Sequence, residues 1–170
     1  MDFISPIEDA IIARLKAKVP GVLVQQYPDD PESFAPAHPV GALLVRYASA
    51  GYSEPKALDV VVQERDILFE VTLAMWSLRG KAGQGGLYSY LDGVRVALTG
   101  YTPSNCQRKL TPTEDGFINR SSGLKGKRLW QYAISFSTTI FNIEVLDDVA
   151  VTLLKRLTTN DNYGDIKDIP

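Results

Sequence analysis

The spacing of apolar residues predicts two helices that each bury one face. The N-terminal sequence Ser5-Pro6-Ile7-Glu8 fits a capping box that begins the first helix at Ser5, and Pro20-Gly21 ends it. The second helix follows a glycine-rich loop and stops at Thr99-Gly100. Their apolar stripes are Ile4, Ile7, Ile11 and Leu15 in the first, and Leu87, Leu91, Val94 and Leu98 in the second.

Runs of alternating or continuous apolar residues predict strands over residues 22–27, 40–47, 67–78 and 129–143. In the last of these, Trp130, Tyr132, Ile134, Phe136 and Ile140 share one face, so we expect most of them in a core or an interface. A short strand pair is expected within 106–118, with its turn at Asp115-Gly116. Loops are expected over 28–39, 48–56 and 119–127.

This order of elements predicts one α/β (α+β) domain over residues 1–146, a mixed, mostly antiparallel sheet with helices packed on one face. Residues 147–170 form a C-terminal tail with one apolar patch, 149–157. We expect this tail to be only partly ordered unless a neighbouring subunit holds it.

Composition narrows the classes of function. The formal net charge is -2 and the pI about 5.4, which argues against a general nucleic-acid binder. No apolar run reaches the ~18 residues that a membrane-spanning helix needs. The N-terminus lacks the basic region of a secretory signal, and Cys106 is the only cysteine, so we expect synthesis in the cytoplasm and no internal disulfide.

The glycine-rich loop 80–86 precedes a helix, where backbone N–H groups could bind a phosphate. The spacing disagrees with a P-loop, because Lys81 lies near the start of the loop and Leu87 follows Gly86. His38 and Cys106 have no partner in the sequence that would make a nucleophile–base pair. We therefore expect no enzyme activity, no cofactor and no metal.

Polar and glycine-rich segments are the candidate interface. Arg79 and Lys81, at the start of the glycine loop, would contact acidic groups of a partner, and the loop would be mobile in an isolated protomer. A basic stretch and the acidic tail could meet across the seam of a head-to-tail ring. The remaining candidate residues are Gly83, Gly85, Arg120, Lys125, Lys127, Arg128, Asp147 and Asp148.

Five segments together resemble the tail terminator, or tail-completion, proteins of Mu-like bacteriophages and prophages. They are SPIEDAIIARLKAKVPGV, HPVGALLVRY, ILFEVTLAMWSLRG, GLYSYLDGVRVALTGY and LWQYAISFSTTIF. The resemblance implies a virion protein in the neck region of the tail, which forms a ring, usually a hexamer, on the head-proximal end of the tail tube. Such a ring stops tube polymerisation and gives a docking face to the head–tail connector or stopper protein.

The partners so implied are copies of the chain itself, the tail tube protein and the connector, with no membrane and no specific nucleic acid. DNA would only pass through the lumen of the ring. Two alternatives stay open: another neck or tail-tube protein of similar fold, and a small nucleotide-binding enzyme that uses loop 80–86.

Overall fold

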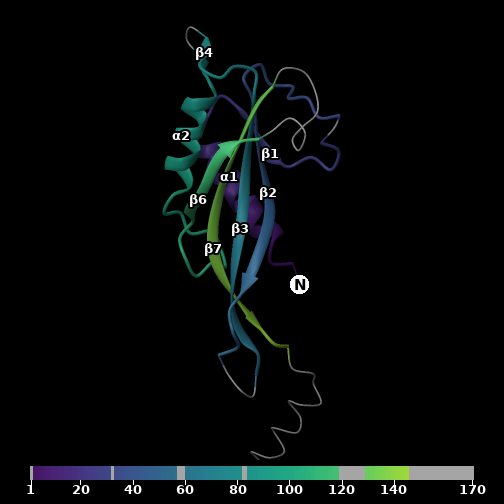
Figure 1. The fold of residues 1–170 in the computed structure, drawn as a ribbon, viewed down its shortest axis with the longest axis vertical. Coiled ribbons are helices and arrows are strands. Elements are labelled where there is room, and N and C mark those ends of the chain that lie inside the picture. The colour runs from purple at the N-terminus through teal and green to yellow at the C-terminus, as the bar shows by residue number, and fades with distance from the viewer. Residues whose placement is uncertain (1, 32, 57–59, 82–83, 119–128, 146–170) are drawn as a thin grey trace, which may run out of the picture.

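The computed structural model describes residues 2–31, 33–56, 60–81, 84–118 and 129–145. It contains one five-stranded sheet with two helices (Figure 1). The sheet order is β1-β2-β3-β7-β6. The strands are β1 (Leu23–Gln26), β2 (Gly41–Tyr52), β3 (Val62–Met75), β7 (Trp130–Ile143) and β6 (Thr111–Phe117). Only β1 and β2 run parallel, so the sheet is mixed and mostly antiparallel, and the predicted fold class is confirmed.

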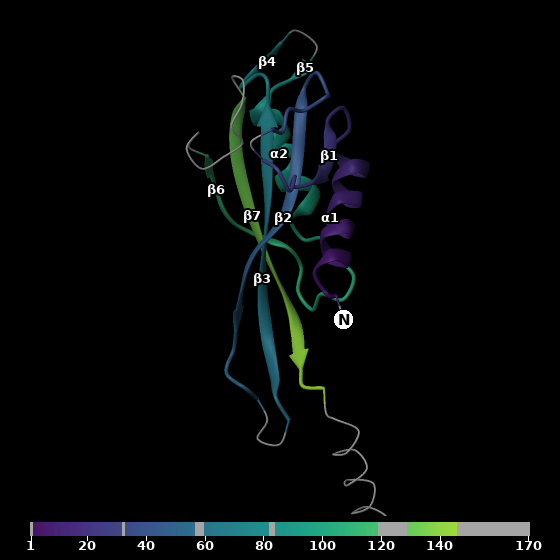
Figure 2. The ribbon, with the colours of Figure 1, turned by 90° about the vertical axis from the view of Figure 1, so that its right-hand side faces the viewer.

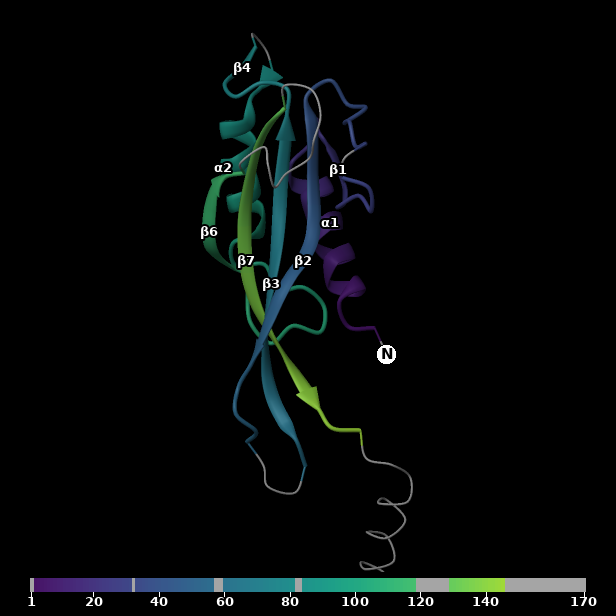
Figure 3. The same ribbon diagram turned by 45° about the vertical axis from the view of Figure 1, so that its right-hand side comes forward.

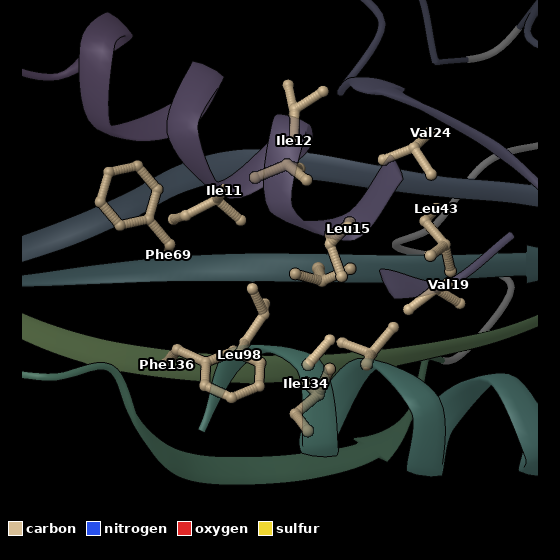
Figure 4. Packing of buried hydrophobic residues seen from close by; sticks show 14 of the residues in the cluster. Ile11, Ile12, Leu15, Val19, Val24, Leu43, Phe69, Leu98, Ile134 and Phe136 are labelled. Atoms are coloured by element: carbon tan, nitrogen blue, oxygen red, sulfur yellow. The ribbon is translucent and has the colours of Figure 1, made fainter. Parts of the chain in front are cut away.

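The helices α1 (Ser5–Lys18) and α2 (Leu87–Leu98) pack against the same face of the sheet, and the core lies between them (Figure 4). Both predicted apolar stripes point into this core, with Ile4 only partly buried. From the sheet, Phe69 of β3 and Phe136 of β7 are completely buried there. The alternation along β3 and β7 decides which side chains face the helices, as the sequence predicted.

The cap of α1 differs from the prediction. The N-cap is Ile4, which makes no side-chain capping hydrogen bond, and Ser5 lies inside the helix; Asp2 Oδ1 accepts hydrogen bonds from the N–H groups of Ile4, at 3.0 Å, and Ser5, at 3.1 Å. Hydrogen bonds from the Ser5 side chain and backbone lower the pKa of the Asp2 carboxyl. Pro6 has no N–H to satisfy, so an acid placed before it can cap the exposed donors of the first turn.

The predicted loop over 48–56 is wrong for its first half, because β2 continues to Tyr52. A bulge between Tyr47 and Ser49 interrupts the register, and the strand then pairs with β3 as far as Tyr52↔Arg65. We call this projecting part, residues 49–56 and 60–66 with the end of β7, the arm; it extends beyond both helices (Figures 2 and 3). Small polar residues suit this strand because no helix covers it.

The predicted turn at Asp115-Gly116 is also wrong. Residues 111–117 form a single strand, β6, whose Asp115 and Gly116 pair with Ile134 and Ala133 of β7. Asp115 Oδ2 accepts from Arg95 Nη2 of α2 at 2.9 Å. The long partner strand β7 therefore decides the conformation here, and a local turn signal does not.

The sheet face away from the helices is largely polar. Its small apolar cluster is Ala42, Leu44 and Ala74, against which Leu23, Tyr27 and Phe34 pack. Beside this cluster Arg46 pairs with Glu70 at 2.9 Å. In the part of the chain that the structure describes, neither helix has the length and apolar character to cross a membrane.

Candidate functional site

The glycine loop is a small hairpin, β4 (Gly80–Lys81) and β5 (Gln84–Gly85), at the end of the molecule opposite the arm (Figures 1 and 2). Gly80 has a φ of +87°, and its N–H donates to Ser77 Oγ at 3.0 Å. A Cβ on Gly86 would lie 2.1 Å from the Gly80 nitrogen, so no other residue fits there without a shift of backbone. The base of the hairpin is thus closely packed.

The start of α2 does not offer its donors to an anion. The N–H groups of Leu87 and Tyr88 donate to the carbonyls of Ser77, at 3.0 Å, and Leu78, at 3.3 Å. The cleft beside the hairpin, which Trp76, Ser77 and Lys81 line, holds about 90 Å³. Small-molecule sites usually hold ~300–1,000 Å³, so this geometry counts against the nucleotide-binding alternative.

Arg79, Lys81 and Gly85 are exposed at the hairpin. Neither cation takes part in an ion pair with any residue that the structure describes. Their predicted contact with acidic groups of a partner stays a prediction. Gly83 lies outside the described residues.

An aromatic cluster lies at the same end, on α2, β6 and β7. The Tyr132 ring meets Phe117 edge-to-face at 5.5 Å and Tyr88 at 6.3 Å, measured between ring centroids. Tyr88, Phe117 and Trp130 are each more than 40% exposed. Aromatic residues are enriched at protein interfaces, so we call these four residues the aromatic end and treat them as a candidate contact surface.

The basic residues Arg120, Lys125, Lys127 and Arg128 lie outside the described residues, but the chain on both sides of them is placed. The Ile118 N–H donates to the Gln131 carbonyl at 3.0 Å. Ile118, the last described residue before this segment, is therefore fixed beside the aromatic end.

The arm forms a second candidate surface at the opposite end. Ion pairs hold its hairpin: Lys56 Nζ lies 2.6 Å from Glu64 Oε1, and Arg108 Nη2 lies 3.5 Å from Glu64 Oε2. The hydrogen bond and charge of Lys56 lower the pKa of Glu64. Four large apolar side chains are nevertheless exposed on the arm: Tyr52, Val61, Phe141 and Ile143.

Asp147 and Asp148 lie outside the described residues; the last described residue before them, Val145, is at the arm end. Along the 14 residues of β7, at ~3.4 Å per residue, the arm end and the aromatic end are about 45 Å apart. A contact between acidic tail and basic segment across a ring seam therefore needs the tail to run back along β7, or protomers that are shifted lengthwise.

The two residues considered for catalysis have structural contacts. His38 Nδ1 accepts from the Val40 N–H at 3.3 Å, and its carbonyl accepts from Trp76 Nε1 at 3.2 Å. Cys106 is half-buried against the core, and burial raises the pKa of its thiol. Within the described ranges, no group of three or more His, Cys, Asp or Glu side chains could hold a metal ion.

Sequence reasoning missed the exposed apolar residues of the arm. The first part of β3 was not predicted as a strand because Gln63-Glu64-Arg65-Asp66 is polar, and the end of β2, from Ser49 to Tyr52, was predicted as a loop. The β-branched run Val60-Val61-Val62 before that polar segment is the sequence feature that could have indicated a strand here.

The family model described as "Gp37 protein" matches residues 11–162 of the chain. A search of curated proteins gives no match.

Proposed function

The chain belongs to the Gp37 protein family, a phage-related family, and on this premise we propose that it is a structural protein of the phage tail. It caps the head-proximal end of the tail tube as a ring of identical subunits. The ring stops tube polymerisation and gives the head connector a docking face. It acts by shape and contact, without catalysis.

The observation that carries this proposal is the unlike character of the two ends of one elongated protomer. One end gathers the exposed cations Arg79 and Lys81 with the aromatic cluster around Tyr132. The other end is the arm, with exposed Tyr52 and Ile143. A cap needs two different faces, because one must bind the tube and the other must not accept a further tube ring.

In the ring, protomers stand side by side with their long axes near the ring axis, so that all aromatic ends form one face and all arms form the other. One face copies the contact that a tube subunit makes. The other face lacks what the next tube ring would bind. Each contact is weak alone, but the ring repeats it around the axis.

The test uses phage particles assembled with variants of the protein. Loss of the protein should give tails of uncontrolled length that do not join heads, as seen by electron microscopy. Tyr88→Glu at the aromatic end and Val61→Glu on the arm should each impair one of these two steps. Val96→Glu, on an α2 side chain that is 80% exposed and far from the arm, is the matched control. Normal tails joined to heads without the protein would contradict the proposal.

The second candidate function, a tail-tube or other neck protein, predicts a different defect. Without a tube subunit, no tubes would form at all, whereas without a cap they form and fail to stop. Nucleotide binding predicts a monomer that ATP or GTP stabilises against heat, which a thermal-shift measurement tests directly.

A further inference from the structure

An apolar groove lies where three segments meet near the arm: the start of α1, the loop before β6 and the end of β7. It holds about 220 Å³, and its lining is Phe3, Ile7, Asn105, Gln107, Ile140, Phe141 and Ile143. Ile7 and Ile140 form its buried floor, whereas Phe3, Phe141 and Ile143 are 46%, 43% and 59% exposed. The groove thus continues the hydrophobic core to the surface.

The outer edge of β7 is open beside this groove. Pairing with β6 ends at Thr111↔Ser137, and the last backbone contact on that side is the Gln107 N–H donating to the Thr139 carbonyl at 2.7 Å. Alternation along the strand points the backbone groups of Phe141 and Ile143 to the same side. From the described residues they receive no backbone hydrogen bond there.

The described chain ends next to the groove. Glu144 is fixed by two hydrogen bonds with Val61, one from its own N–H to the carbonyl and one from the Val61 N–H to its carboxylate, both at 2.8 Å. Val145, the last described residue, is 90% exposed. A further 25 residues follow it.

Those residues contain an apolar sequence that needs a partner. In 149–157, VAVTLLKRL, the residues Val149, Ala150, Leu153, Leu154 and Leu157 recur at the spacing of one helix face. Asp147-Asp148 before this sequence and Lys155-Arg156 near its end match the charge preference of a helix. The family match continues to residue 162, so this segment belongs to what the family shares.

We propose that the groove is the docking site for residues 149–157 of the same chain. The four residue steps from Val145 to Val149 span up to ~14 Å, enough for the chain to turn back onto Phe141 and Ile143. A tether this short gives an effective concentration in the millimolar range, which favours the chain's own segment over any free partner. The groove is smaller than the ~300–1,000 Å³ of small-molecule sites, and it suits apolar side chains of a peptide. The inference does not depend on the proposed function.

A double-mutant cycle in the full-length chain tests the contact. Leu153→Asp should lower the urea midpoint of unfolding and raise the fluorescence of the dye ANS, which binds exposed apolar surface. Thr152 falls outside the apolar face that this spacing predicts, so Thr152→Asp is the matched control. It should change neither the urea midpoint nor the ANS fluorescence. Combined with Phe141→Asp, Leu153→Asp should have little further effect, because the contact is already lost. Fully additive effects, or equal effects of the Leu153 and Thr152 variants, would overturn the proposal.

Cross-linking then identifies whose segment occupies the groove. In a Cys106→Ser background, Gln107→Cys on the groove rim and Leu157→Cys should form a disulfide within one chain, seen as a faster-migrating monomer without reductant. Pairing Leu157→Cys with Val96→Cys on α2 is the control and should give no such bond. A ladder of cross-linked oligomers would assign the groove to a neighbouring copy, and the absence of any cross-link would remove the segment from it; either result overturns the docking within one chain.

Discussion

Phe136 of β7 belongs to the core between the sheet and the helices, and none of its surface is exposed (Figure 4). Phe136→Ala should therefore reduce the free energy of unfolding by about 3–5 kcal/mol, because the ring leaves a cavity that the packed neighbours fill only in part. Urea denaturation measures the change. Val96→Ala, on an exposed side chain of α2, should stay within about 0.5 kcal/mol of the parent. A loss below about 1 kcal/mol for Phe136→Ala would be incompatible with the buried position.

Gly86 offers a second test on the scale of single residues. A Cβ there would lie 2.1 Å from the Gly80 nitrogen and 2.2 Å from the Arg79 carbonyl carbon, both backbone atoms. Gly86→Ala should cost about 1–3 kcal/mol of unfolding free energy, because the β4–β5 hairpin must move away from the start of α2. Gly116→Ala, where nothing lies within 4 Å of the added carbon, is the control in the same assay. Equal stability of the two variants would show that the hairpin base is loosely packed.

Among the elements, the arm contains an ion pair whose strength follows pH. Lys56 lowers the pKa of Glu64 below its ordinary value of 4.5, first through a hydrogen bond and then through its charge. The stabilisation is therefore present above that value and is lost as the pH falls through the lowered pKa. An NMR titration should place the Glu64 midpoint below 4.5, and Lys56→Met should move it upward. A midpoint that Lys56→Met leaves unchanged would remove Lys56 as the cause.

The elements that the sequence predicted correctly are those whose own residues specify them. The apolar stripes of α1 and α2 and the alternation in β7 each extend over 12 or more residues. A pattern of this length can be recognised from the sequence alone. The errors concern β6 and the arm, where polar strand residues pair with distant partners. Asp115-Gly116 is a good turn locally, but pairing with β7 and the contact with Arg95 outweigh it. Tertiary pairing of this kind leaves no short-range pattern.

On the scale of the whole molecule, the sequence indicated charged candidates but not their arrangement. Arg79 and Lys81 are exposed. The glycine hairpin and the arm lie at opposite ends of one sheet because β2, β3 and β7 are long. The strands predicted from the sequence were too short for two of these three, β2 and β3. The apolar surface of the arm follows from the same extension, since a strand without a covering helix exposes both of its faces.

The last prediction concerns assembly through the hairpin end. Arg79→Glu combined with Lys81→Glu should weaken ring closure or tube binding and leave the fold intact, because both side chains are exposed and pair with none of the described residues. Light scattering reports the size of the assembly, and a complementation assay reports the capping of tails. Lys16→Glu with Lys18→Glu, on the exposed end of α1, makes the same change in net charge away from the hairpin. Equal effects of the two pairs would mean that net charge governs assembly, whereas a defect confined to the first pair would locate the contact at the glycine hairpin.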